Sequence, residues 1–181
     1  MAVGFDTEPR RQQELRGRPL ADAIYKRTLQ AVNIRRFSPD DAESFVLDQV
    51  FGIDAEITLP TLQVLSCQEK FLSHKYASFN SLTFEHMQEP TTGEEGDWFR
   101  LRADLILIAY FTEDGAAFEK WAVVDVPLLK IATLYGHVHW EDNKNQDGRA
   151  RASFLWTDVA KLPAKCVLFK RGNWRAKAVA A

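Results

Sequence analysis

The chain has few cysteines, no long apolar run and almost no net charge, and each shortage excludes a class of protein. The two cysteines, Cys67 and Cys166, are too few for a disulfide framework and form no CxxC pair. Apolar runs such as 105–111 are far shorter than the roughly 20 residues that cross a bilayer. With 23 basic and 25 acidic residues, the formal net charge of −2 does not favour indiscriminate coating of nucleic acid.

The remaining composition is that of an ordinary globular protein. Apolar residues make up 46% of the 181 positions and charged residues 27%, and the length suits a single domain. We expect a flexible N-terminal arm over 1–18 with four arginines, a single domain over 19–170 and a C-terminal tail over 171–181. The first residues contain no apolar signal segment, so we expect a cytoplasmic protein with no membrane association.

Hydrophobic periodicity predicts an α/β (α+β) fold, with a mixed central sheet flanked by helices. Helical spacing runs over 20–32 and 127–135. A further helix is predicted from Ser38, a good N-cap, to Gly52, a typical stop. The predicted strands cover 53–59, 62–71, 81–87, 102–111, 120–126, 153–156 and 166–170.

The first two strands are separated only by a short turn and should pair as an antiparallel hairpin. On the first strand, Asp54 falls on the polar side, opposite Ile53 and Ile57. On the second, Gln68 and Lys70 share one face, while Glu69 points to the other. Asp54, Gln68 and Lys70 are therefore predicted to share one polar side of the sheet.

These residues resemble the metal-binding motif of the PD-(D/E)xK nuclease superfamily, in a variant with QxK. The motif is carried by Gly52-Ile53-Asp54 and by Gln68-Glu69-Lys70, behind an acidic helix. The resemblance covers about residues 38–135 and implies a mixed sheet flanked by helices with Mg²⁺-dependent (or Mn²⁺-dependent) hydrolysis of DNA phosphodiester bonds. It also leaves open a homodimer, since nucleases of this kind often need two copies to cut both strands.

The resemblance implies a role for each motif residue. Asp54 and Gln68 would supply side-chain oxygens to the metal, and Glu69 would add its backbone carbonyl. Oxygen donors of this kind suit Mg²⁺. Lys70 would orient the attacking water or neutralise charge on the phosphate. An amide at position 68 leaves the site with less negative charge than a carboxylate, which should weaken its affinity for metal.

Two further acids are candidate accessory metal ligands. Glu43 lies on the predicted acidic helix, and Glu85 lies on the strand predicted over 81–87. Glu85 also has a plain alternative as the cross-strand partner of a lysine.

Two other functions stay open at this point. The Gln substitution and the near-neutral charge also fit a catalytically inactive nucleic-acid-binding or assembly module on the same scaffold. His137 and His139 share one face of an extended segment near Glu141, which is a pattern for a transition-metal enzyme. No further His or Cys stands at recognised metal-ligand spacing beside them.

Overall fold

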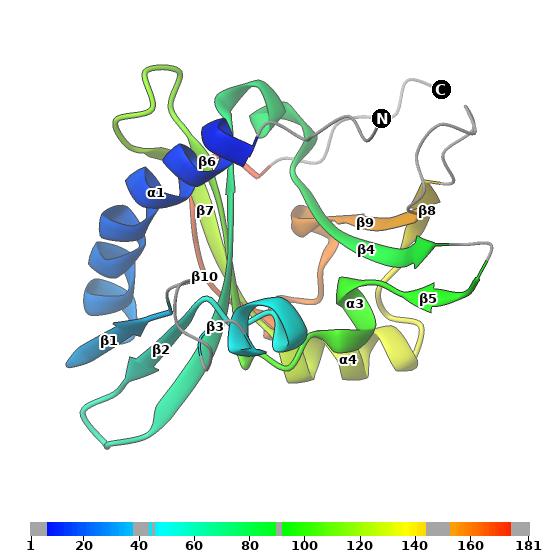
Figure 1. Cartoon of the computed structure of the whole chain (residues 1–181), viewed down its shortest axis with the longest axis horizontal. Helices are drawn as coiled ribbons and strands as arrows, with labels where there is room; N and C mark the ends of the chain where they lie inside the picture. The colour runs from blue at the N-terminus through cyan, green and yellow to red at the C-terminus, as the bar shows by residue number, and fades with distance from the viewer. Residues whose placement is uncertain (1–6, 38–43, 45, 90–91, 144–152, 175–181) are drawn as a thin grey trace.

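The computed structural model describes residues 7–37, 44, 46–89, 92–143 and 153–174, and its strands form two sheets (Figure 1). The six-stranded sheet has the order β1-β2-β3-β6-β7-β10, with the bounds Asn33–Arg36, Ala55–Thr58, Val64–Leu72, Leu105–Phe111, Phe118–Asp125 and Val167–Arg171. The four-stranded sheet has the order β5-β4-β9-β8, with the bounds Glu94–Glu95, Ser81–Glu89, Ser153–Asp158 and Glu141–Asn143.

Helical segments connect these strands. The α-helices are α1 (Thr7–Thr28), α3 (Asp97–Arg100) and α4 (Val126–Leu134), and η1 (Val46–Val50) is a short π-helix. The 3-10 segments are η2 (His74–Phe79), η3 (Val159–Lys161) and η4 (Ala164–Cys166). No helix in the described part of the chain is long and apolar enough to cross a membrane.

The predicted mixed sheet is confirmed. Strand β3 pairs in parallel with β6, while the other neighbours in the six-stranded sheet are antiparallel. A parallel pair needs a crossover, because the chain must return to the end where it began. Here the crossover between Leu72 and Leu105 contains η2, β4, β5 and α3. The central strand β6 is buried along its whole length, as its continuous apolar run predicts.

The two faces of the six-stranded sheet are covered by different layers. Helix α1 packs on one face through Ala21, Ile24 and Tyr25, against alternate residues of β6 that begin with Leu105. On the other face, α4 and β4 pack against the intervening positions of β6, which begin with Ile106. The α1 helix and the α4 helix therefore lie on opposite sides of the sheet (Figure 1).

The predicted ends of the domain need correction. Helix α1 begins at Thr7, so residues 7–18 are helical rather than a flexible arm. Hydrophobic periodicity could not predict this part of the helix, because Leu15 is the one large apolar residue within 7–18 and its side chain is exposed. Contact with the sheet is made through a glycine: a Cβ at Gly17 would lie 2.3 Å from the Phe71 ring. At the other end, Trp174 is buried against Tyr110, so the packed domain extends beyond residue 170.

Among the internal elements, several predicted strands are found, not every observed strand was predicted, and one predicted helix is described only in part. The strands predicted over 53–59, 62–71 and 81–87 correspond to β2, β3 and β4. Strand β1 was not predicted, because the side chains of Asn-Ile-Arg-Arg show little apolar alternation. The helix predicted between Ser38 and Gly52 is described only at Ser44 and from residue 46 on, where Val46–Val50 is π-helical. The remaining positions of that prediction lie outside the described residues.

Candidate functional site

The β2–β3 hairpin brings together two of the predicted site residues. Ala55 pairs with Cys67 in the antiparallel register, which places Asp54 opposite Gln68. The Asp54 N–H donates to the Cys67 carbonyl over 2.9 Å and extends the pairing by one residue beyond β2. Directly opposite residues project from the same face of a sheet, so the predicted hairpin and its shared polar face are both confirmed.

A polar pocket of about 170 Å³ opens beside this pair. The hairpin contributes Asp54 and the 68–70 segment to its wall. The chain before and after the hairpin adds the other lining residues, which are Asp48, Val50, Gly52, Asp97 and Arg100. A volume of this size holds about six waters at the density of the liquid. It fits a hydrated ion or an anionic group and is too small for an entire nucleotide.

Asp54 lies in this pocket as an unusually basic carboxyl group. Desolvation raises the pKa of Asp54 to about 7, and the charges of Glu69, Asp48 and Glu14 add to the increase. A hydrogen bond from the Glu69 N–H to Asp54 Oδ2, 2.6 Å long, acts in the opposite direction. A nearby cation would favour the ionised form of Asp54, since opposite charges lower the pKa of an acid.

Gln68 contributes an unsatisfied oxygen. Its side-chain Oε1 is buried and has no hydrogen-bond partner. A buried amide oxygen without a partner costs roughly 1–3 kcal/mol. Because Gln68 also lines the pocket, this acceptor is available to a ligand that brings a cation or a donor.

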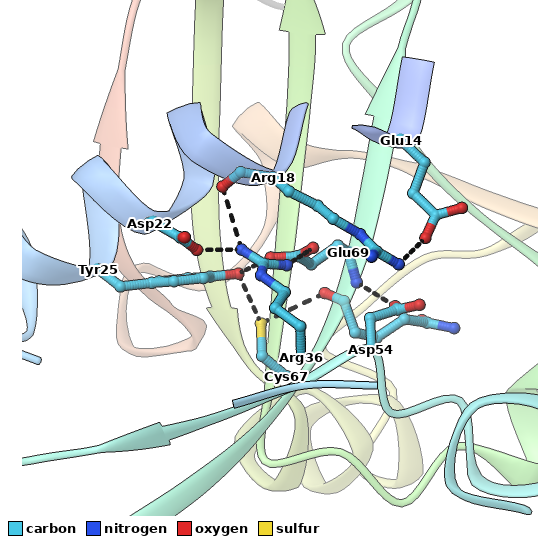
Figure 2. A network of polar contacts seen from close by, with 9 residues as sticks. Glu14, Arg18, Asp22, Tyr25, Arg36, Asp54, Cys67 and Glu69 are labelled. Atoms are coloured by element: carbon cyan, nitrogen blue, oxygen red, sulfur yellow. Dashed lines mark hydrogen bonds and ion pairs between the residues drawn. The ribbon is translucent and has the colours of Figure 1, made fainter. Parts of the chain in front are cut away.

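The backbone of Glu69 contacts Asp54, while its side chain points to the opposite face of the sheet, toward α1. Its N–H holds Asp54, and the carbonyl of a residue in an extended strand points to the same side as its N–H. Its carboxylate turns toward α1, as the strand alternation predicts, and accepts hydrogen bonds from Tyr25 Oη (2.7 Å) and Arg36 (Figure 2). The side chain is therefore a structural anchor, and its carbonyl lies on the side of Asp54.

The Arg36 guanidinium links three elements around this anchor. It bonds Glu69 on β3, and Asp22 and the Arg18 carbonyl on α1 (Figure 2). Tyr25 Oη also lies 3.2 Å from Cys67 Sγ. Burial raises the pKa of the Cys67 thiol, so this cysteine behaves as a core residue and not as a nucleophile.

Lys70 also lines the pocket, as predicted for a residue on the Gln68 face. Its Nζ lies 4.8 Å from the centre of the Phe84 ring, a cation–π distance. The aromatic ring belongs to β4, so a strand of the second sheet contacts the ammonium group.

Of the two predicted accessory acids, only Glu85 can be placed, and it does not line the pocket. Glu43 lies outside the described residues. Glu85 is on β4, in the four-stranded sheet and not in the six-stranded one, and its cross-strand partner is Phe154 rather than a lysine. Burial raises the pKa of Glu85, with a further increase from Asp97, while Arg100 and Lys70 lower it. The charges of pocket residues thus shift the pKa of Glu85, although Glu85 itself does not line the pocket.

Several pocket residues could not be found from sequence spacing. Asp48 belongs to η1, and Asp97 and Arg100 belong to the four-residue helix α3. Glu14 lies on α1, is paired with Arg18, and influences the Asp54 carboxyl through its charge. Only the tertiary fold brings these segments to one place, because they belong to separate elements before and after the hairpin.

The alternative histidine site gains no support from the geometry. His137 and His139 are exposed, and His137 stacks on the Tyr135 ring with 6.4 Å between centroids. Within the described ranges, no three or more His, Cys, Asp or Glu side chains are grouped so that they could hold a metal ion. The hairpin pocket also lacks such a group among its described residues, so the Gln68 amide and the Glu69 carbonyl must complete any ligand set there.

Comparison with protein-family models, with curated proteins and with solved structures finds no match for this chain.

Proposed function

We propose that the chain is a Mg²⁺-dependent nuclease, similar to the PD-(D/E)xK superfamily, that hydrolyses phosphodiester bonds of DNA at the hairpin pocket. The observation that carries this proposal is the pairing of Asp54 with Gln68. One offers a carboxylate whose pKa is raised to about 7, and the other a buried oxygen without a partner. Without a cation, the buried acceptor and the desolvated carboxylate both lower the stability of the fold. A bound cation removes both free-energy costs.

The donor set suits Mg²⁺ better than a tightly caged metal. Asp54 and Gln68 would hold the ion with side-chain oxygens, and the Glu69 carbonyl lies beside them. Mg²⁺ usually keeps several waters and needs only one or two protein carboxylates, so a group of three acids is not required. When bound, the ion would polarise the scissile phosphate and lower the pKa of a bound water.

The remaining pocket residues have roles that their positions support. Lys70 is a cation in the same wall and would orient the attacking water or offset charge on the phosphate. The Glu69 N–H fixes one oxygen of Asp54, which leaves the other oxygen to face a ligand. Helices on both faces of a mixed sheet agree with the architecture that the resemblance implies.

Plasmid nicking in Mg²⁺ and in Mn²⁺ tests the proposal. We expect Asp54→Asn and Lys70→Met to lose most of the cleavage that the wild type shows, and EDTA to abolish it. Glu56→Gln is the matched control for Asp54, because Glu56 lies two residues further along the hairpin but pairs with Arg35 outside the pocket. Lys75→Met is the control for Lys70, because Lys75 is an exposed lysine of η2 that does not line the pocket. Undiminished cleavage by both pocket variants would contradict the proposal.

The second candidate is a catalytically inactive nucleic-acid-binding or assembly module on the same scaffold. It is favoured by the amide at position 68 and by the lack of a three-acid group among the described residues. Calorimetric titration with Mg²⁺ and Mn²⁺ separates the two functions. Binding that is lost in Asp54→Asn supports the nuclease, while no binding by a folded wild-type protein supports the module.

A further inference from the structure

Helix α3 contributes Asp97 and Arg100 to the wall of the pocket. Gly96, just before this helix, donates its N–H to the His86 carbonyl over 2.9 Å. A Cβ on Gly96 would lie 2.4 Å from the Glu85 carbonyl oxygen, so the close approach to β4 requires glycine. Leu101, directly after α3, is 1% exposed in the core. These two anchors fix the helix between them and hold Arg100 at the pocket.

Arg100 has donors that the protein does not use. Its Nη2 reaches Asp97 Oδ1 at 3.4 Å, which is long for an N–H···O bond. Its Nε is buried and has no hydrogen-bond partner. The side chain as a whole is nevertheless 37% exposed, and it lines the pocket. A buried N–H without a partner is unfavourable unless a ligand supplies an acceptor.

The neighbouring cations differ from Arg100 in this respect. Arg102 donates through Nη1 to the carbonyls of Phe99 and Leu101, and Lys130 donates to the Leu101 carbonyl over 2.7 Å. Neither residue lines the pocket. Arg100 is therefore the cation on this segment that combines a position in the pocket wall with an unused donor.

We propose that Arg100 forms a phosphate subsite in the hairpin pocket. It binds the phosphate of the DNA backbone next to the scissile phosphate, which lies at the metal held by Asp54 and Gln68. A guanidinium presents a planar fork of N–H groups that matches two phosphate oxygens. The phosphate replaces the long contact from Nη2 to Asp97 Oδ1. Lys70, in the same wall, adds a second positive charge for the backbone. This subsite rests on the proposed function and specifies how its substrate is held.

The test measures the equilibrium binding of a short fluorescein-labelled DNA duplex in EDTA, where no cleavage occurs. Titrations between about 50 and 200 mM salt give the salt slope, which is about −0.9 per phosphate neutralised. We expect Arg100→Gln to weaken binding about tenfold and to make the slope shallower by about one phosphate. Arg100→Lys should keep most of the slope while losing affinity, because an ammonium is a point charge without the fork. Arg102→Gln should bind like the wild type.

Each outcome bears on the subsite or on the enzyme separately. Equal salt slopes for Arg100→Gln and Arg102→Gln overturn the subsite, even if the wild type cleaves DNA in Mg²⁺. A slope that depends on Arg100 in a protein that never cleaves DNA supports the subsite and contradicts the nuclease. A wild type that does not bind DNA in EDTA overturns the subsite, while cleavage in Mg²⁺ remains the test of the nuclease. Thermal melting of each variant shows whether the fold is retained, and Arg100→Lys provides a second reading if Arg100→Gln is unstable.

Discussion

The backbone N–H of Glu69 donates to Asp54 Oδ2 over 2.6 Å, so the residue that anchors β3 to helix α1 also fixes the carboxyl group of the pocket. On the far side of the sheet, the Glu69 carboxylate is held by Tyr25 and Arg36. Burial raises the pKa of Glu69, while Arg36 and the Tyr25 hydrogen bond oppose that increase. The packing of α1 and the position of Asp54 are thereby connected through one residue.

Tyr25→Phe should destabilise the protein through this connection. The substitution keeps the ring but removes the hydroxyl that donates to Glu69 Oε1 over 2.7 Å, leaving a buried acceptor with one donor fewer. We expect the free energy of unfolding to fall by about 1–3 kcal/mol, measured by urea denaturation. Tyr76→Phe is the control, because Tyr76 is 45% exposed. Equal stabilities of the two variants would show that the Tyr25 hydroxyl is energetically unimportant.

Asp54 should make stability depend on pH in a metal-free buffer. Its pKa is raised from 3.8 to about 7, so the folded state binds this proton more tightly than the unfolded state does. Stability from this group is present at low pH and is lost as the pH rises from about 4 to about 7. Asp54→Asn lacks the penalty, and we expect it to be more stable than the wild type at pH 8 by a few kcal/mol, with little difference near pH 4.

Thermal melting in EDTA across this pH range measures the effect. Glu56→Gln is the control, since Glu56 forms a surface ion pair with Arg35 outside the pocket. A stability difference between Asp54→Asn and wild type that does not change with pH would argue against a raised pKa at Asp54.

Gly17→Ala sets helix propensity against packing. In an exposed helix, replacing Gly by Ala stabilises by about 1 kcal/mol. Here a Cβ at position 17 would lie 2.3 Å from the Phe71 ring, which itself stacks on Phe118 at 5.4 Å. Overpacking of this kind costs about 1–3 kcal/mol, so the steric effect should win and the variant should be less stable. Lys26→Ala, at an exposed position of the same helix, should change stability by less than about 0.5 kcal/mol. An increase in the urea midpoint of Gly17→Ala would show that α1 moves away freely.

The hairpin could be predicted from sequence because its signals are local. Alternation along 53–59 and 62–71 is enough to predict that Asp54 and Gln68 share one face and that Glu69 points to the other, while the register that sets Asp54 directly opposite Gln68 comes from the structure. The Arg36 network could not be predicted in this way. Strand β1 shows little apolar alternation, and α1 begins in a polar segment with Pro19 inside the helix. Strand β1 is tied in through the ion pairs of Arg36, and the N-terminal half of α1 through the contact of Gly17 with Phe71, and neither leaves a trace in hydrophobic periodicity.

The pocket residues that the sequence did not reveal have a common cause. Asp48 comes from a π-helix, and Asp97 and Arg100 come from a helix of four residues. Segments this short carry no periodic pattern, and the crossover between two sheets decides where they lie. Glu85 was misplaced for a similar reason, because strand alternation does not say which of two sheets a strand joins.

Gln68→Glu should lower the stability of the metal-free protein and raise its affinity for divalent metal. The Gln68 Oε1 is buried without a partner in the same pocket as Asp54, whose pKa the charges of Glu69, Asp48 and Glu14 already raise. A second carboxylate at this position adds like charge to the pocket, so we expect a lower melting temperature than wild type in EDTA at pH 8. It also supplies the charged oxygen that divalent cations prefer, so Mn²⁺ should bind more tightly and raise the melting temperature by more than in the wild type. Calorimetry with Mn²⁺ and melting in both buffers measure the two effects, and Gln63→Glu on the adjacent turn is the control for added charge. If Gln68→Glu binds Mn²⁺ no better than Gln63→Glu does, then position 68 does not face the metal and Asp54 must recruit its partners elsewhere.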